Sequence, residues 1–296
     1  MTLLKCATHV VADLAAAIER YTTWMDYSLV ESGEVPDDLA AAWGAPASAG
    51  RGYAVLGPAS GEPVYLRFVA GDPVPNYRPI RTWGWAAIEL CVSDVHAVHE
   101  RMLASPFEVI GPPKVLDGFA TVTPMQVRGA DLETVYLTQI NQPGPDTGLP
   151  QPRSLIDRPF IMVLACPDLP AAMAWWRALF GLEMIDPVAI NYSMISLAFG
   201  LPEGEKVALT TVRGADQVFI ELDQYPAAAT ARPAHPGALP PGVAITTMLY
   251  PDFARLDPHW ASPPVVREGP LYGGRRTGVL RTPEGALLEV IEGGTL

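Results

Sequence analysis

The sequence predicts an α+β protein built from four tandem βαβββ modules that pair into two cupped, barrel-like domains. One short phrase recurs along the chain: an apolar strand-like run, an Asp, and then apolar residues at helical spacing. The four Asp residues lie 81, 74 and 84 residues apart and are Asp13, Asp94, Asp168 and Asp252. A fourfold period of this length indicates tandem supersecondary units rather than a solenoid of short repeats.

Composition limits what kind of protein this is. A chain of 296 residues with 49% apolar and 18% charged residues is long enough for two globular domains. A net charge of −12 disfavours nucleic acid as a partner, and the absence of an 18-residue apolar run argues against a membrane span. The start of the sequence runs directly into a predicted strand, so it makes a poor signal peptide. Three widely spaced cysteines fit a reducing cytoplasm, with each thiol a small buried apolar group.

The first two modules can be laid out element by element. An apolar run ends before Asp13, whose carboxylate can accept hydrogen bonds from the first free amides of a helix that reaches about residue 24. Asp94 has the same place in the second module, where Val95, Val98 and Met102 then share one helical face. Gly and Pro separate the remaining runs. The predicted strands are 4–11, 51–56 and 64–69 in the first module and 85–92, 121–127 and 134–140 in the second.

The last two modules follow a linker-like stretch. Residues 141–154 contain four prolines and two glycines, which favours an interdomain connection. Asp168 begins a helix expected to reach residue 180, and a fourth helix is expected near 253–260. The predicted strands are 160–165, 207–212 and 218–222, then 243–249, 277–281 and 287–291. A sheet with a helix on one face cannot bury both faces alone, so consecutive modules should pair. The predicted domains are 1–141 and 155–296, with a linker at 142–154.

Two motifs carry a resemblance to a known family. The Val-x-Asp-Leu-x-x-Ala junction at 11–17 and the closing Thr-Pro-Glu-Gly-Ala-Leu-Leu-Glu-Val-Ile-Glu at 282–292, together with the repeated modules, resemble the vicinal oxygen chelate superfamily. That superfamily contains glyoxalase I, bleomycin-resistance proteins, methylmalonyl-CoA epimerase and extradiol dioxygenases. The resemblance covers nearly the whole chain, and the layout of four modules is similar to that of an extradiol dioxygenase. It implies two cupped cavities, each of which holds a divalent metal in the metalloenzymes of the family.

The resemblance also implies where metal ligands would lie. A His is expected seven residues before each capping Asp, but these positions hold Cys6, Ala87, Ile161 and Ile245. A Glu is expected on each last strand, and the matching positions are Tyr65, Tyr136, Glu221 and Glu289. Iron-dependent extradiol cleavage requires two His and one carboxylate, so that reaction is disfavoured. Glyoxalase-type isomerisation, which expects a filled metal shell, is disfavoured for the same reason.

Glu221 and Glu289 are therefore the leading catalytic candidates, and both are expected in the cavity of the C-terminal domain. Two carboxylates in an apolar site repel each other and raise at least one pKa, which suits a general base near neutral pH. They could also bind Mg²⁺ or Mn²⁺ with water completing the shell. Alternatively, they face solvent or pair with Arg275 or Arg276. The cofactor expectation is accordingly either none or an atypically bound divalent metal.

The N-terminal cavity offers a second set of candidates. Glu89 is expected beside Tyr65 and Tyr136, an arrangement suited to acid–base chemistry, although Glu89 could simply hydrogen-bond to Tyr136. His9 is a weak metal candidate because strand parity turns it away from Cys6, unless a one-residue bulge reverses that face.

Aromatic side chains near strand ends could wall a site for an aromatic ligand. The three candidates are Trp43, Trp83 and Trp85.

These observations favour an enzyme that transfers a proton, as an isomerase or lyase, on a small aromatic or carbonyl-containing molecule. Its expected partner is that small organic molecule, with neither nucleic acid nor membrane, in a cytoplasmic monomer or homodimer. One alternative is a non-catalytic protein that binds or sequesters a small molecule, similar to bleomycin-resistance proteins. Another is an atypical metal-dependent dioxygenase with ligands from unexpected positions.

Overall fold

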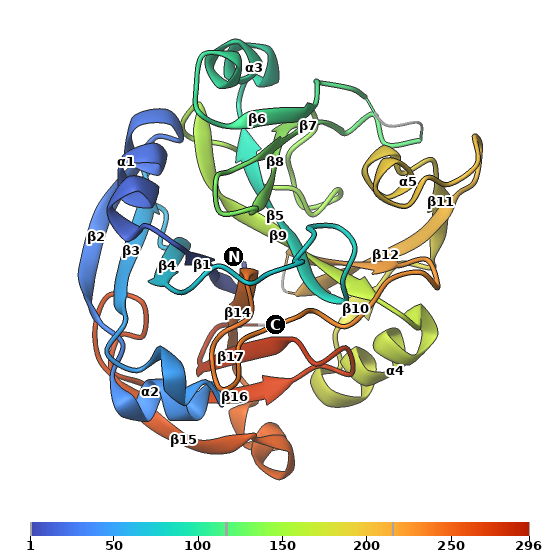
Figure 1. Cartoon of the computed structure of the whole chain (residues 1–296). Coiled ribbons are helices and arrows are strands. Elements are labelled where there is room, and N and C mark those ends of the chain that lie inside the picture. Colours follow the sequence, from blue (N-terminus) through green and yellow to red (C-terminus); the bar gives the residue numbers. More distant parts are fainter. Residues whose placement is uncertain (1, 116–117, 215, 296) are drawn as a thin grey trace.

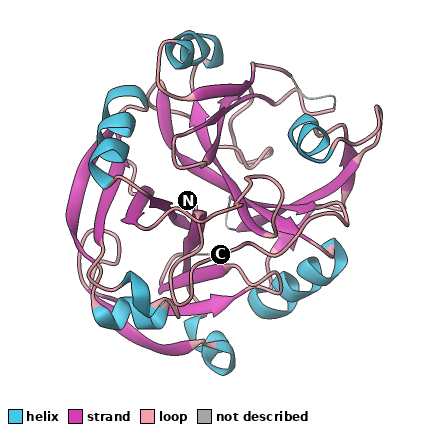
Figure 2. Ribbon diagram, in the orientation of Figure 1, coloured by secondary structure: helices cyan, strands magenta, loops and turns pink. Residues whose placement is uncertain are grey.

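Helices surround two mixed β-sheets in the computed structural model, which describes residues 2–115, 118–214 and 216–295 (Figure 1 and Figure 2). The first module consists of β1 (Leu4–Val11), α1 (Leu14–Trp24), β2 (Tyr27–Glu34), α2 (Asp37–Ala42), β3 (Gly52–Pro58) and β4 (Tyr65–Ala70). The second consists of β5 (Gly84–Val92), α3 (Val95–Leu103), β6 (Glu108–Gly111), β7 (Val122–Arg128) and β8 (Thr134–Ile140).

The third and fourth modules repeat this order with local changes. The third consists of β9 (Ile156–Cys166), α4 (Leu169–Phe180), β10 (Glu183–Met184), β11 (Val188–Ile190), α5 (Ser193–Phe199), β12 (Val207–Gly214) and β13 (Gln217–Gln224). The fourth consists of β14 (Gly242–Tyr250), a 3₁₀ helix (Phe253–His259), β15 (Ser262–Arg267), β16 (Arg275–Arg281) and β17 (Leu287–Glu292). The predicted α+β class with four βαβββ modules is confirmed.

Asp caps explain three of the four predicted helices. The Asp13 carboxylate accepts from the Ala16 amide at 3.0 Å, Asp168 accepts from Ala171 at 2.9 Å, and Asp94 caps α3 in the same way. Asp252 makes no such side-chain bond, and the segment after it is a 3₁₀ helix that contains Pro258. A Pro lacks the amide that an α-helix interior needs, so the fourth helix is only partly formed.

The pairing of modules differs from the prediction. One sheet has the order β15-β16-β17-β14-β1-β4-β3-β2 and the other β10-β12-β13-β9-β5-β8-β7-β6, so module 1 pairs with module 4 and module 2 with module 3. In every module the first strand lies parallel to its own last strand, which leaves its other edge open. β1 closes that edge antiparallel to β14, and β5 antiparallel to β9. Either partner would satisfy the open edge, so the local sequence does not reveal the choice.

Consecutive modules are neighbours in a different way. The Arg20 side chain on α1 pairs with Asp131 of module 2 at 2.6 Å, and the Tyr250 hydroxyl of module 4 donates to the Phe180 carbonyl of module 3 at 2.8 Å. One large apolar core includes side chains from both sheets and from α1, α3 and α4. The predicted linker is packed as well, since the Gly148 carbonyl accepts from the Val218 amide at 3.0 Å. Residues 1 and 296, the outer limits of the predicted domains, lie outside the described residues.

The cysteines behave as small buried groups, as the sequence predicted. Cys6, Cys91 and Cys166 are free and buried, and burial raises the pKa of Cys6 and of Cys91 to about 12.

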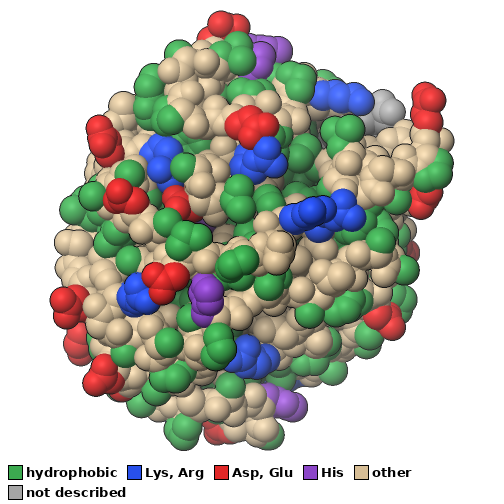
Figure 3. All heavy atoms as spheres, viewed as in Figure 1, with side chains coloured by type: hydrophobic (Ala, Val, Ile, Leu, Met, Phe, Trp, Pro, Cys, Tyr) green, Lys and Arg blue, Asp and Glu red, His purple; other side chains and the backbone are tan. Residues whose placement is uncertain are grey.

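The surface and the helices have two plain features. None of the helices in the described ranges is long and apolar enough to cross a membrane. On the face in Figure 3, basic side chains are scattered among acidic and apolar ones rather than gathered into one patch.

Candidate active site

The strand register brings four side-chain positions together on each sheet. On the first sheet Thr8 pairs with Arg67 across β1 and β4, and Thr247 pairs with Glu289 across β14 and β17. We call the cavity beside them, between modules 1 and 4, the first cavity. On the second sheet, Glu89 pairs with Tyr136 and Val163 with Glu221. We call the cavity beside these residues, between modules 2 and 3, the second cavity.

A buried ion pair fills the floor of the first cavity. Arg67 is 2% exposed and Glu289 is fully buried, and the Arg67 Nη2 lies 3.3 Å from the Glu289 Oε2. The guanidinium also donates to Thr8 at 2.9 Å and to Tyr272 at 2.6 Å. The carboxylate accepts from Thr247 at 2.8 Å, Trp43 at 3.0 Å and Tyr272 at 3.2 Å. Such complete hydrogen bonding is what allows an ion pair to remain charged inside a protein.

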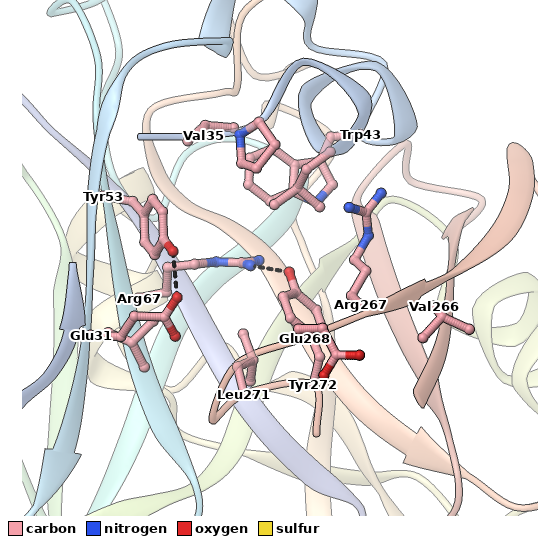
Figure 4. Close-up of a pocket in the computed structure, with 13 residues that line it drawn as sticks. Glu31, Val35, Trp43, Tyr53, Arg67, Val266, Arg267, Glu268, Leu271 and Tyr272 are labelled. Atoms are coloured by element: carbon pink, nitrogen blue, oxygen red, sulfur yellow. Dashed lines mark hydrogen bonds between the residues drawn. The ribbon is translucent and has the colours of Figure 1, made fainter. Parts of the chain in front are cut away.

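Aromatic rings surround this pair. The Arg67 guanidinium lies 4.7 Å from the centre of the Trp43 ring, and Figure 4 shows Tyr53 and Tyr272 on opposite sides of it. The Tyr53 hydroxyl donates to Glu31 at 2.5 Å. Although burial alone favours neutral arginine, Tyr272 and Glu289 raise the pKa of Arg67, so it stays a cation. The cavity has a volume of about 290 Å³.

The first cavity does not fit the divalent metal that the family resemblance implies. The Arg67 guanidinium already neutralises Glu289, and a second cation there would be repelled. Across the part of the chain that the structure describes, no three His, Cys, Asp or Glu side chains are arranged to hold a metal ion. Neither cavity has a His among its described lining residues.

The second cavity combines apolar walls with a polar floor. Its volume is also about 290 Å³, and its apolar lining includes Phe119, Val122, Phe160, Ile161, Met194 and Leu209. Tyr192 precedes α5 and donates to the Glu221 Oε1 at 3.0 Å. The Tyr136 hydroxyl lies 3.2 Å from that of Tyr192, so the two phenols and Glu221 form a hydrogen-bonded chain. Thr138 donates to Glu89 on the same floor.

The carboxyl groups of this floor have strongly altered acidity. Burial, helped by repulsion from Glu221, raises the pKa of Glu89 to about 8. Burial raises the pKa of Glu221, and burial together with Glu221 raises that of Asp223 well above its usual value. Both Asp223 oxygens are buried and accept from no donor group in the described residues. Because two buried carboxylates side by side repel each other, we infer that Glu221 and Asp223 share a proton instead of both being ionised.

Glu221 and Glu289, predicted to share one cavity, lie on different sheets, so that expectation is wrong. The alternatives proposed for Glu289 do not hold either: it is fully buried, Arg276 pairs with Glu292 instead, and Arg275 donates to the Tyr272 carbonyl. The pairing of Glu289 with an arginine is real, but that arginine is Arg67.

Cys6 and Tyr65 lie on the first sheet, whereas Ala87 and Tyr136 lie on the second, so they do not form one N-terminal cavity. The register also shows that Arg67, two residues beyond Tyr65, is the counterpart of Tyr136. Tyr65 lines neither cavity and instead carries the Lys5 ammonium 5.0 Å from its ring centre.

The expected cavity of the C-terminal domain separates in the same way. Ile161 lies on β9 in the second sheet, where it lines the second cavity beside Glu221. Ile245 lies on β14 in the first sheet with Glu289.

His9 faces away from the first cavity, as strand parity predicted, and packs 5.8 Å from the Phe68 ring. A register shift between Thr8 and His9 does occur against β14, but it leaves His9 in the apolar core. Burial lowers the pKa of His9 to about 3, and neither ring nitrogen has a hydrogen-bond partner among the described residues. His9 is therefore a core residue.

The three tryptophans line a hollow together, and this hollow is neither the first nor the second cavity. Trp43, Trp83 and Trp85 meet at a space of about 310 Å³ between the two sheets. Trp85 is buried there, and its indole donates to the Leu287 carbonyl at 2.7 Å. The residues that the sequence did not reveal as part of a cavity floor are Arg67, Thr138, Tyr192, Asp223 and Tyr272.

Comparison with solved structures identifies the fold. Glyoxalase I from Zea mays aligns with a TM-score of 0.65 at 14% identity, over 99% of this chain and 92% of the maize chain. This chain has the glyoxalase fold. A putative dioxygenase from Bacillus subtilis shares that fold with a TM-score of 0.65 at 13% identity, over 98% of this chain and 85% of the other. No family model and no curated protein match the sequence. These likenesses confirm the fold that the family resemblance predicted, over 98–99% of this chain.

Proposed function

We propose that the second cavity is the active site of an enzyme that transfers a proton on a small, largely apolar molecule with a carbonyl group. The observation that carries this proposal is the pair Glu89 and Glu221, which lie together on the floor of an apolar cavity, where burial raises the pKa of both. Two interacting carboxyl groups with raised pKa values suit paired acid and base catalysis, because one can donate a proton while the other accepts one.

The reaction can be written with every proton accounted for. Glu221 takes the proton from the carbon next to the carbonyl, and the electrons of that C–H bond form a carbon–carbon double bond. Protonated Glu89 donates its proton to the carbonyl oxygen, which yields a neutral enol. In an isomerase, Glu221 returns its proton to a different carbon while Glu89 takes back the proton of the enol hydroxyl. In a lyase, Glu89 takes back the enol proton as the bond to a group on the next carbon breaks, and that group leaves with the proton from Glu221. Tyr192 holds Glu221 in place by the 3.0 Å hydrogen bond.

No metal takes part in this proposal. The Arg67–Glu289 pair removes the first cavity from the candidates for a metal centre, and the floor of the second cavity works through its own carboxyl and phenol groups. A cytoplasmic location belongs to the same proposal and is supported by the free buried thiols. We also propose a monomer or homodimer.

The test is exchange of deuterium into a small aromatic ketone. Phenylacetone incubated with the enzyme in D₂O should lose its proton signals next to the carbonyl, followed by ¹H NMR. Glu221→Gln should slow this exchange by about 10²–10⁴-fold, and Glu89→Gln should also slow it. Glu31→Gln, the same substitution in the first cavity, is the matched control and should leave the rate unchanged.

Two outcomes would contradict the proposal. Exchange at the wild-type rate in both Glu89→Gln and Glu221→Gln would place the chemistry elsewhere. Tight binding of the ketone without any exchange would favour the alternative of a non-catalytic binding protein.

A further inference from the structure

The two cavities can be compared position by position because their strands have the same register. Thr8 and Arg67 in the first cavity correspond to Glu89 and Tyr136 in the second. Glu289 likewise corresponds to Glu221, and each of these carboxylates accepts from a tyrosine that comes from outside the paired strands. The Tyr272 hydroxyl contacts Arg67 at 2.6 Å, and the Tyr192 hydroxyl contacts Tyr136 at 3.2 Å.

The two floors differ in charge. In the first cavity the Arg67 guanidinium balances Glu289. In the second, an uncharged phenol takes the place of that guanidinium, and a third group, Glu89, takes the place of a threonine. No Lys, Arg or His contributes to the pKa shifts of the three carboxyl groups there. The groups that do contribute are the other acids, Thr138 and Tyr192.

The acids of the second cavity also have unused hydrogen-bonding capacity. Asp223 is 1% exposed and does not line the cavity, but it lies close enough to Glu221 for that group to raise its pKa further. The only basic side chain in the described lining, Arg213, donates to the carbonyls of Pro145 and Asp216 instead. Glu89 accepts from Thr138 and Glu221 accepts from Tyr192, and a carboxylate can accept further hydrogen bonds, so a ligand that brings donors and positive charge would stabilise both.

We propose that the second cavity binds an organic cation, a small apolar group that carries an ammonium or guanidinium, with its charged end where the other half of the molecule places the Arg67 guanidinium. The charged end donates to Glu221 and Glu89, and the apolar part lies against Phe160 and Met194. This inference goes beyond the proposed function: it gives the same cavity a second class of ligand, and it requires no turnover.

Binding of a cation should be coupled to proton release. Burial and Glu221 raise the pKa of Glu89 to about 8, so Glu89 is largely protonated at pH 7 and loses that proton when a cation arrives. Affinity should therefore increase as the pH rises from 6 to 8. The titratable groups around Glu89 are Glu221 and Asp223 on β13, Tyr136 on β8, Tyr192 before α5, and Cys91 on its own strand.

Isothermal titration with benzylguanidinium tests the proposal, because this probe stays charged across that pH range. The neutral isostere benzylurea should bind at least about 10-fold more weakly at pH 8. Glu221→Gln and Glu89→Gln should each weaken the cation by a similar factor, and Glu31→Gln in the first cavity should not. Tyr136→Arg, which supplies the missing internal cation, should abolish binding, whereas Tyr136→Phe should retain it and so reports on folding.

Equal affinity for benzylguanidinium and benzylurea would overturn this inference, as would saturating binding of Mg²⁺ or Mn²⁺ in its place. Ketone exchange that is lost in Glu89→Gln and Glu221→Gln, together with equal affinity for the two probes, would support the proposed function and reject only the proposal of a cationic ligand. Selective binding of benzylguanidinium without exchange of any ketone would support the cationic ligand and reject the proposed function.

Discussion

Arg67 on β4 and Tyr136 on β8 occupy corresponding positions in the two halves of the molecule, one charged and one neutral. This single difference gives the two cavities different characters. The first has a closed ion pair, and the second has acids without a counter-ion. The chain therefore has one half suited to structural stability and one half suited to chemistry or binding.

Arg67→Met should destabilise the protein strongly because it leaves Glu289 buried without a counter-ion. We expect a loss of about 3–5 kcal/mol in the free energy of unfolding, measured with urea. The double variant Arg67→Met/Glu289→Met should recover most of it. Arg51→Met removes an exposed ion pair to Asp72 and should cost almost nothing. A mild effect of Arg67→Met would mean that the ion pair does not hold this floor together.

Glu89→Gln should change how stability depends on pH. The pKa of Glu89 is raised to about 8 by burial, so the folded state binds more protons than the unfolded state between about pH 4.5 and 8. Stability of the wild type should fall across that window as the pH rises. The variant lacks this proton and should show a slope that is flatter by up to about 1.4 kcal/mol per pH unit. Identical slopes for the two proteins would show that Glu89 titrates normally.

Tyr192→Phe should move the pH profile of ketone exchange. The Tyr192 hydroxyl favours ionised Glu221, so its removal raises the pKa of Glu221 further. The base would then ionise only at higher pH, and the rising limb of the rate should shift upward by about 1–2 pH units. If the exchange rate falls at every pH and the profile does not shift along the pH axis, Tyr192 contributes only to packing.

Asp168→Ala should cost about 1 kcal/mol in the free energy of unfolding, because it removes the side-chain acceptor for the Ala171 amide at the start of α4. Asp252→Ala is the matched control, since Asp252 makes no cap hydrogen bond, and its loss should be negligible. Equal losses from both substitutions would contradict the different capping of the two segments.

Local features of the fold were predictable because short-range contacts produce them. The caps at Asp13, Asp94 and Asp168 follow from a side chain and amides two or three residues away. The partner of β1 was not predictable, because β14 lies more than 200 residues later and any open strand edge would serve.

The composition of each cavity floor depended on such long-range registers. The sequence predicts Tyr65 as the counterpart of Tyr136, which is wrong by two residues and misses Arg67, because the register between β1 and β4 cannot be counted from the helix cap. Tyr192 and Tyr272 lie in connecting segments with no periodic pattern, so only the folded chain brings them to Glu221 and Glu289. The sequence identifies Glu89 and Glu221 as candidates, but it does not predict that both lie in the same cavity.

The partnership of the first and last modules sets an order of events during synthesis. The second sheet uses one continuous stretch from β5 to β13, so all of its strands exist once residue 224 has left the ribosome. β1 is made before β14, yet the edge that β14 will cover stays open until residue 250 emerges. The nascent chain thus carries an unprotected strand edge while the second and third modules are made, and an open edge is a site for aberrant association. Of the strands in these two sheets, the one made earliest is among the last to gain its second neighbour.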